Sequence, residues 1–88
     1  MVRGVTSSGF AFEVSENIVN DMELFEALAE LDAGKILAII PVFRKILGDQ
    51  QKQALYDHLR EPDGRVPMDK AEAEILEIFA AVKDGKKS

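Results

Sequence analysis

The stretch Lys35-Ile-Leu-Ala-Ile-Ile-Pro-Val-Phe-Arg-Lys-Ile-Leu47 decides the fold, because it is apolar on almost every side and its few charges are cations. A helix without a polar face is normally central in its fold, or it is buried by a partner. Pro41 lacks a backbone donor and its ring clashes with the preceding turn, so we expect a kink or a fresh helix start there. Gly48 is expected to end this segment.

An amphipathic segment precedes this stretch. Ser15 is a suitable cap for a helix over 16 to 32, with acids in its first turn. Its apolar residues recur at helical spacing: Ile18, Met22, Phe25, Leu28 and Ala29. Asn20-Asp21 is an alternative start that would divide the segment, but one continuous helix is the preferred interpretation. Asp32-Ala33-Gly34 is expected to close it, because Gly tolerates the left-handed end of a helix.

Two more helices are predicted after Gly48. Asp49 is expected to cap a helix over about 50 to 60, in which Leu55 and Leu59 face inward. The last helix, over about 68 to 83, has an apolar stripe made of Ala71, Ile75, Phe79 and Val82, widened by Leu76 and Ile78. The acids of this helix (Glu72, Glu74 and Glu77) are interpreted as a solvated face, and residues 84 to 88 as a flexible polar tail.

Residues 1 to 15 are predicted to form a β-hairpin or an extended arm. Phe10, Phe12 and Val14 alternate with Ala11 and Glu13, which is the period of a half-buried strand. Residues 7 to 9 supply a turn across which residues 4 to 6 can pair back. The whole chain, 1-88, is therefore expected to be one mainly α domain, a small bundle of about four helices with this hairpin or arm.

Composition limits the classes of partner. The net charge of -5 and the absence of a basic cluster argue against nucleic acid. The chain has no Cys, so it has neither a disulfide framework nor a thiolate nucleophile. No apolar run approaches the ~20 residues of a membrane span, and residues 1 to 4 do not begin an apolar signal core.

A calcium loop is the first hypothesis for the segment Tyr56-Asp-His-Leu-Arg-Glu-Pro-Asp-Gly-Arg-Val-Pro67, because Asp63-Gly64 lies between two predicted helices. An EF-hand loop needs an oxygen ligand at its first position and a bidentate Glu at its twelfth. Placing Gly64 at the sixth position puts Leu59 first and Lys70 twelfth. We therefore expect no metal site but a Pro-Asp-Gly turn.

No catalytic constellation is recognisable, so we expect no enzyme, no catalytic residue and no cofactor. His58 is the sole histidine, and its neighbour Asp57 points about 100° away on a helix. The favoured interpretation is a structural helical histidine rather than a general base. Arg60 and Arg65 flank the turn, where pinning the loop is favoured over a charged docking contact.

Three segments together resemble the small tail assembly chaperones of long-tailed bacteriophages and prophages of Gram-positive hosts. They are the acidic helix Asp21-Met-Glu-Leu-Phe-Glu-Ala-Leu-Ala-Glu30, the run Leu55-Tyr-Asp-His-Leu-Arg-Glu-Pro-Asp-Gly-Arg-Val-Pro67, and the closing Glu74-Ile-Leu-Glu-Ile-Phe79. The similarity extends over roughly residues 9 to 80. The middle run is its distinctive part, whereas the helices are generic.

The resemblance implies a non-enzymatic helper that binds the tape measure protein, helps recruit tail tube protein, and is absent from the finished particle. It implies action in the host bacterial cytoplasm, and a longer product made by ribosomal frameshifting near Gly85-Lys86-Lys87. Self-association into a homo-oligomer remains open. The alternatives are a small structural or adaptor protein retained in the particle, and a degenerate EF-hand sensor.

The physical pattern and the resemblance agree on an apolar binding surface. A long helical partner offers apolar stripes, which an acidic protein with an apolar groove can cover. The candidate partner-facing residues are Ile36, Ile39, Ile40 and Phe43, together with Phe10 and Phe12.

Overall fold

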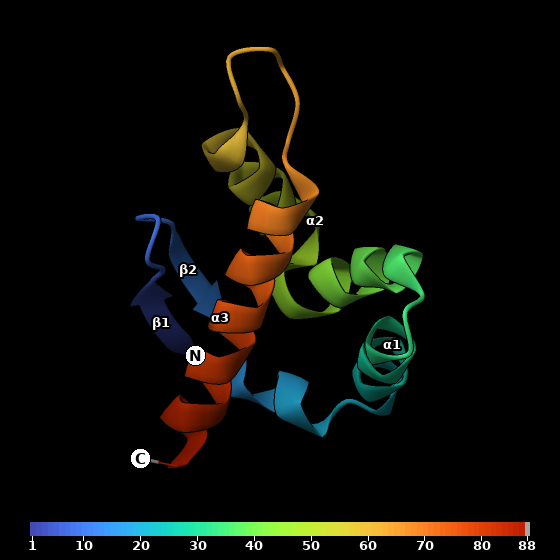
Figure 1. The fold of residues 1–88 in the computed structure, drawn as a ribbon. Helices are drawn as coiled ribbons and strands as arrows, with labels where there is room; N and C mark the ends of the chain where they lie inside the picture. Colours follow the sequence, from blue (N-terminus) through green and yellow to red (C-terminus); the bar gives the residue numbers. More distant parts are fainter. Residues whose placement is uncertain (88) are drawn as a thin grey trace.

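The fold is mainly helical with one two-stranded hairpin at its N-terminus, which confirms the predicted class. The computed structural model describes residues 1–87, in the order β1 (Val2–Val5), β2 (Ala11–Val14), η1 (Glu16–Asn20), α1 (Met22–Asp32), η2 (Ile36–Ala38), α2 (Ile39–Leu59) and α3 (Met68–Lys87). Figure 1 shows α3 through the middle of the molecule, with the hairpin along one flank and α1 on the other. The first part of α2 runs crosswise to α3, so the helices do not form a parallel bundle.

The hairpin follows the predicted alternation. Its strands pair antiparallel from Val2 opposite Val14 to Val5 opposite Ala11. The turn closes through Gly9, whose φ of 94° suits a residue without a side chain. Phe10, Phe12 and Val14 are buried, because one face of the pleat packs on the helices. Of the two predicted forms, a β-hairpin or an extended arm, the structure has the hairpin, and it packs on the helices of the same chain.

The predicted helix over 16 to 32 is divided, and the preferred single-helix interpretation was wrong. Asp21 has an extended backbone, and its Oδ1 accepts hydrogen bonds from the N–H groups of Glu23 (3.0 Å) and Leu24 (3.2 Å). These bonds satisfy helix-terminal donors, so α1 starts afresh after a short 3-10 turn. The restart shifts the buried face to Leu24 and Ala27 and leaves Met22 and Phe25 exposed, contrary to the predicted stripe.

The apolar stretch enters the fold as expected, with a fresh start before Pro41 and a break at Gly48. Pro41 lies in the first turn of α2, where a missing N–H leaves no hydrogen bond unmade. Gly48 has φ 76° and ψ 166°, so the helical segment is two arms joined by a sharp kink. A side chain is strained in that backbone region, which explains why glycine occupies the corner.

The C-terminal helix is longer than predicted. It continues to Lys87 instead of ending near residue 83, so the tail predicted over 84 to 88 is helical through 87, and Ser88 lies outside the described residues. A Cβ placed on Gly85 would lie 3.2 Å from a methyl of Val2. The end of α3 therefore packs against β1, and this tertiary contact supports a helical end that sequence alone suggested would fray.

The core lies where the arms of α2, helix α3 and strand β2 meet. Its fully buried side chains include Phe43, Leu24, Leu55, Ile75, Ile78, Val14, Val42 and Val82. The stripe predicted for the last helix is confirmed, Ile78 included, except that Leu76 is exposed. Apolar burial at roughly 25 cal/mol per Å² is the main stabilising contribution in such a core.

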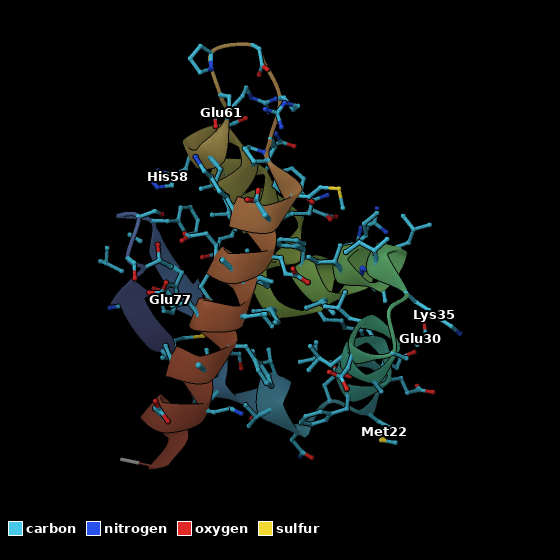
Figure 2. All side chains as sticks on the ribbon, in the orientation of Figure 1. Met22, Glu30, Lys35, His58, Glu61 and Glu77 are labelled. Atoms are coloured by element: carbon cyan, nitrogen blue, oxygen red, sulfur yellow. The ribbon has the colours of Figure 1, made fainter. Side chains whose placement is uncertain are left out.

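Two glutamates of α3 fix the hairpin turn to the helix. Glu74, expected on a solvated face, is instead buried and accepts hydrogen bonds from the hydroxyls of Thr6 (2.7 Å) and Ser8 (2.8 Å). Glu77 accepts the backbone N–H of Ser7 at 2.8 Å. Figure 2 shows Glu77 on the hairpin side of α3. Burial of Glu74 is tolerated because its carboxylate is hydrogen-bonded.

Candidate protein-binding groove

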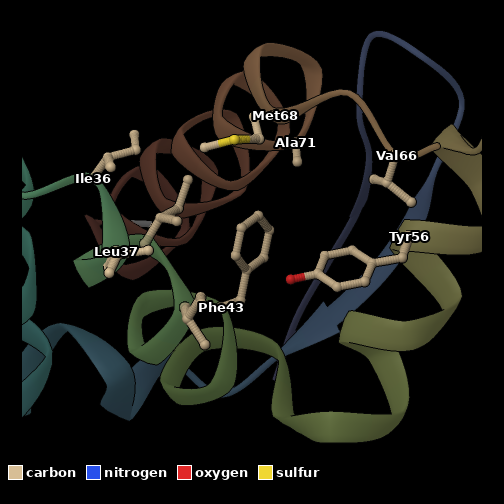
Figure 3. Close-up of a pocket in the computed structure, with 9 residues that line it drawn as sticks. Ile36, Leu37, Phe43, Tyr56, Val66, Met68 and Ala71 are labelled. Carbon is tan, nitrogen blue, oxygen red and sulfur yellow. The ribbon is translucent and has the colours of Figure 1, made fainter.

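An open apolar hollow of about 300 Å³ lies between η2, α2 and the beginning of α3. Figure 3 shows the ring of Phe43 at its centre, with Leu37 and Met68 on one side and Tyr56 and Val66 on the other. Its lining residues are Ile36, Leu37, Ile39, Ile40, Phe43, Tyr56, Val66, Met68 and Ala71. We refer to this hollow as the groove.

The groove gathers large apolar side chains that the fold leaves in contact with solvent. Leu37 is 75% exposed, Met68 60%, Ile36 45% and Ile40 40%. The apolar stretch from 35 to 47 is therefore covered on one side by the core and open on the other. A hollow of this composition is typical of a surface that takes an apolar side chain or a helix from another protein.

Four of the predicted partner-facing residues line the groove, namely Ile36, Ile39, Ile40 and Phe43. They divide by exposure. Ile36 and Ile40 present their side chains to solvent, whereas Ile39 and Phe43 are buried and form the floor. Leu37 and Met68 were not singled out from the sequence. Leu37 could have been found, because it lies within the apolar stretch from 35 to 47, but Met68 reaches the groove only because α3 folds back against α2.

The two hairpin phenylalanines do not line the groove. Phe10 and Phe12 are 7% and 6% exposed and belong to the hydrophobic core. The ring of Phe10 also lies beside that of His58, with centroids 5.6 Å apart. Because these rings fill the space between the hairpin and the helices, we remove them from the set of partner-facing residues.

An aromatic pair supports the floor and one wall of the groove. The rings of Phe43 and Tyr56 meet edge to face, with centroids 5.6 Å apart and planes at 79°, a favoured geometry for aromatic side chains. The Tyr56 hydroxyl points into the hollow (Figure 3) and makes no hydrogen bond within the described residues 1–87. The groove therefore carries one polar group on an otherwise apolar wall.

The loop from Arg60 to Pro67 carries Val66 to the edge of the groove. Arg60 donates hydrogen bonds to the carbonyl of Gly64 (2.8 Å) and to Oδ1 of Asp57 (2.9 Å). The bond from Arg60, helped by one from Gln53, holds the pKa of Asp57 below its ordinary value of 3.8. The expectation that Arg60 pins this loop is confirmed. Arg65 contacts Asp63 at 3.4 Å within the same turn.

A second polar cluster joins Ser8, His58 and Glu74, but its geometry is not that of a nucleophilic triad. The Nε2 atom of His58 lies 3.1 Å from the Ser8 hydroxyl and 3.2 Å from the Ser8 carbonyl. In a triad the acid orients the histidine. Here the Ser8 hydroxyl instead donates its hydrogen bond to Glu74, at 2.8 Å. The arrangement secures the hairpin turn, so His58 is the exposed structural histidine that the sequence predicted.

Among residues 1–87, no group of three His, Cys, Asp or Glu side chains is placed to hold a metal ion. Within the same range, no helix combines the length and apolarity needed to cross a bilayer.

Protein-family models, characterised proteins and solved structures show no match to this chain.

Proposed function

We propose that this protein is a non-enzymatic phage tail assembly chaperone whose groove holds an apolar stripe of the helical tape measure protein. In this role it acts in the host cytoplasm, assists polymerisation of the tail tube protein, and leaves before the particle is complete. The observation that carries the proposal is the open groove in a domain whose other large apolar side chains are mostly buried.

The size and shape of the groove support a helical occupant. An amphipathic helix presents apolar side chains at positions i, i+3, i+4 and i+7, and such a row fits a hollow lined on three sides by helices. Phe43 and Ile39 form a fixed floor, since both are buried against the core. Leu37 and Met68 are exposed at the rim, and the unbranched side chain of Met68 can adapt to the surface of the occupant.

The charge of the protein also suits a chaperone of an apolar partner. The net charge of -5 on 88 residues repels other copies of the complex and opposes non-specific association. A partner helix whose apolar stripe is buried in the groove would also be kept from non-specific association by this negative charge.

Co-expression with the tape measure protein encoded in the same gene cluster tests the proposal. We expect the chaperone to raise the soluble fraction of that protein and to co-purify with it. Leu37→Ser and Met68→Ser should each weaken the complex, while Met22→Ser serves as the matched control. Met22 is 76% exposed, lies on α1 and does not line the groove. Equal co-purification of all three variants, or a tape measure protein that is soluble alone and does not bind, would contradict the proposal.

The second candidate is a small structural or adaptor protein that remains in the particle. Mass spectrometry of purified particles separates the two functions. A chaperone is absent or far below the copy number of the tube protein, whereas an adaptor is present at a fixed ratio to a structural component.

A further inference from the structure

Most cations in the described part of the chain already have an acidic partner. Six lysine and arginine side chains lie within 4.0 Å of a carboxylate oxygen: Arg3, Arg44, Lys45, Arg60, Arg65 and Lys70. The N-terminal ammonium group is likewise paired, with Glu16 at 2.9 Å. Among the basic side chains that the structure describes, Lys35, Lys52 and Lys83 have no such partner. Two of these three lie next to residues that line the groove: Lys35 directly precedes Ile36, and Lys52 lies over the ring of Tyr56. Lys83 lies on α3 over Phe79, which does not line the groove.

Lys52 lies against the wall of the groove that carries Tyr56. Its Nζ is 5.5 Å from the centroid of the Tyr56 ring. This position holds the ammonium group near the edge of the hollow, since a cation is attracted to the face of an aromatic ring. The unpaired Tyr56 hydroxyl points into the same hollow (Figure 3). A hydrogen-bond donor and a free cation thus lie together at this end.

Lys35 lies at the other end of the apolar surface. Ile36 and Leu37 line both the groove and an adjoining shallow hollow that also includes Glu30, Lys35 and Pro41. Glu30 lies in α1 and makes no ion pair with Lys35 among the described residues. Figure 2 places Lys35 at the outer edge of the connection between α1 and α2. The apolar surface therefore continues from Tyr56 past Leu37, with an unpaired ammonium group at each end.

The wall formed by α3 has a different charge. Asp69 is exposed directly after Met68, and its neighbour Lys70 is already paired with Glu61 at 3.3 Å. Glu72 lines a separate hollow beside α1. Lysines without an acidic partner are thus found beside η2 and α2, whereas the lysine on the α3 side, Lys70, is paired.

We propose that the groove selects an amphipathic helix whose apolar stripe is bordered by Asp or Glu on the side that faces Lys35 and Lys52. This inference rests on the proposed chaperone function and adds the chemistry of the partner segment. The carboxylates meet the two free ammonium groups, and the Tyr56 hydroxyl donates to a carboxylate or carbonyl of the helix. Complementary charge fixes the orientation and register of the helix more than it raises affinity.

The overall charge of the protein would favour the opposite partner. A net charge of -5 attracts basic peptides in general. Preference for an acidic helix can therefore arise only from the local arrangement of Lys35 and Lys52, which makes the inference sharply testable.

The test uses three synthetic helical peptides of about 20 residues, long enough to be helical in isolation. They share one apolar stripe and differ only in the bordering residues, which are Glu, Gln or Lys. We expect the Glu peptide to bind the wild-type protein most tightly by fluorescence anisotropy at low salt. Its advantage over the Gln peptide should disappear at about 1 M salt, where the screening length falls to about 3 Å.

Charge reversal identifies the residues responsible. Lys35→Glu with Lys52→Glu should weaken the Glu peptide on the order of tenfold, from the modest value of each exposed charge pair. Lys83→Glu is the matched control, because Lys83, like Lys52, lies over an aromatic ring, that of Phe79 at 5.3 Å, and has no carboxylate within 4.0 Å among the described residues. Thermal melting of each variant verifies that it is folded.

The outcomes separate the two proposals. Equal binding of the Glu and Lys peptides, with both weakened by Leu37→Ser, would overturn the acidic preference and leave the groove function standing. Failure of all three peptides to bind at millimolar concentration would count against both. Concentration-dependent self-association of the protein alone that Leu37→Ser abolishes would assign the groove to a second copy and overturn this inference.

Discussion

Replacing Thr6 by Val and Glu74 by Leu, singly and together, tests whether the buried hydroxyl–carboxylate contact holds the hairpin to α3. Thr6 and Glu74 are 5% and 6% exposed, and their oxygens are 2.7 Å apart. Hydrogen bonds to a charged group contribute about 1.5–3 kcal/mol to stability, and a buried polar group left without its hydrogen-bond partner costs a similar amount. We therefore expect each single substitution to lower the free energy of unfolding by about 2–3 kcal/mol.

The double variant should cost less than the sum of the single ones, because both partners are then apolar and of similar shape. The expected coupling energy is about 2 kcal/mol. The Thr6 hydroxyl oxygen also accepts a hydrogen bond from the N–H of Phe10 at 3.1 Å. Thr6→Val removes this bond whether or not Glu74 is present, so its contribution cancels in the double-mutant cycle that gives the coupling energy. A protein of this size has a total stability on the order of 4–13 kcal/mol, so the single effects should be large.

Urea unfolding followed by far-UV circular dichroism gives the four free energies. The more exposed contact between Ser7 and Glu77 is the internal control, and Ser7→Ala with Glu77→Gln should couple by less than about 1 kcal/mol. A Thr6–Glu74 coupling energy within about 0.5 kcal/mol of zero would refute the argument. It would mean that apolar packing of β1 and β2 alone positions the hairpin.

Three further substitutions test other parts of the fold. Gly48→Ala should destabilise the protein by about 1–3 kcal/mol through backbone strain alone, because nothing lies within 4 Å of the added Cβ; an unchanged urea midpoint would contradict this. The hydrogen bond from the backbone N–H of Leu24 is the main reason why the pKa of the Asp21 carboxyl lies below its ordinary value of 3.8. The ionised carboxylate therefore stabilises the fold fully above pH 3.8, and this stabilisation is lost as the pH falls through the lower pKa of the folded protein. Asp21→Asn should flatten that acid-side loss while keeping the cap, and an identical pH profile of stability would exclude the mechanism. Gly4→Ala brings a Cβ to 2.8 Å from the ring of Phe12, so thermal melting should fall, and a raised melting temperature would show that the ring can move aside.

Features governed by neighbouring residues were predictable. The alternation of Phe10, Phe12 and Val14 gave the hairpin, and Pro41 and Gly48 marked the start and the corner of α2. Each depends on backbone geometry or on a period within one segment. The Asp21 cap was recognised but not preferred, because the apolar period continues across it. The local hydrogen bonds of the cap outweighed that period.

Features that join distant residues were not predictable. Glu74 is 68 positions from Thr6, and nothing in its own helix distinguishes it from a solvated acid. Gln51 is 38 positions from Glu13, yet its side chain accepts the Glu13 N–H at 2.9 Å and donates to the Glu13 carbonyl at 2.7 Å. It therefore satisfies the free edge of β2 as another strand would.

The sequence by itself determined the hairpin, the breaks at Gly34, Gly48 and Pro62-Asp63-Gly64, and the strongly apolar character of residues 35 to 47. Only the tertiary structure decided which side would be left open. The core takes Ile39 and Phe43, while Met68 and Tyr56 arrive from distant positions to form walls around Ile36 and Ile40. The physical reason is that the apolar residues of the sequence set how much surface should be buried, whereas the packing angles of the helices set which part of that apolar surface stays exposed.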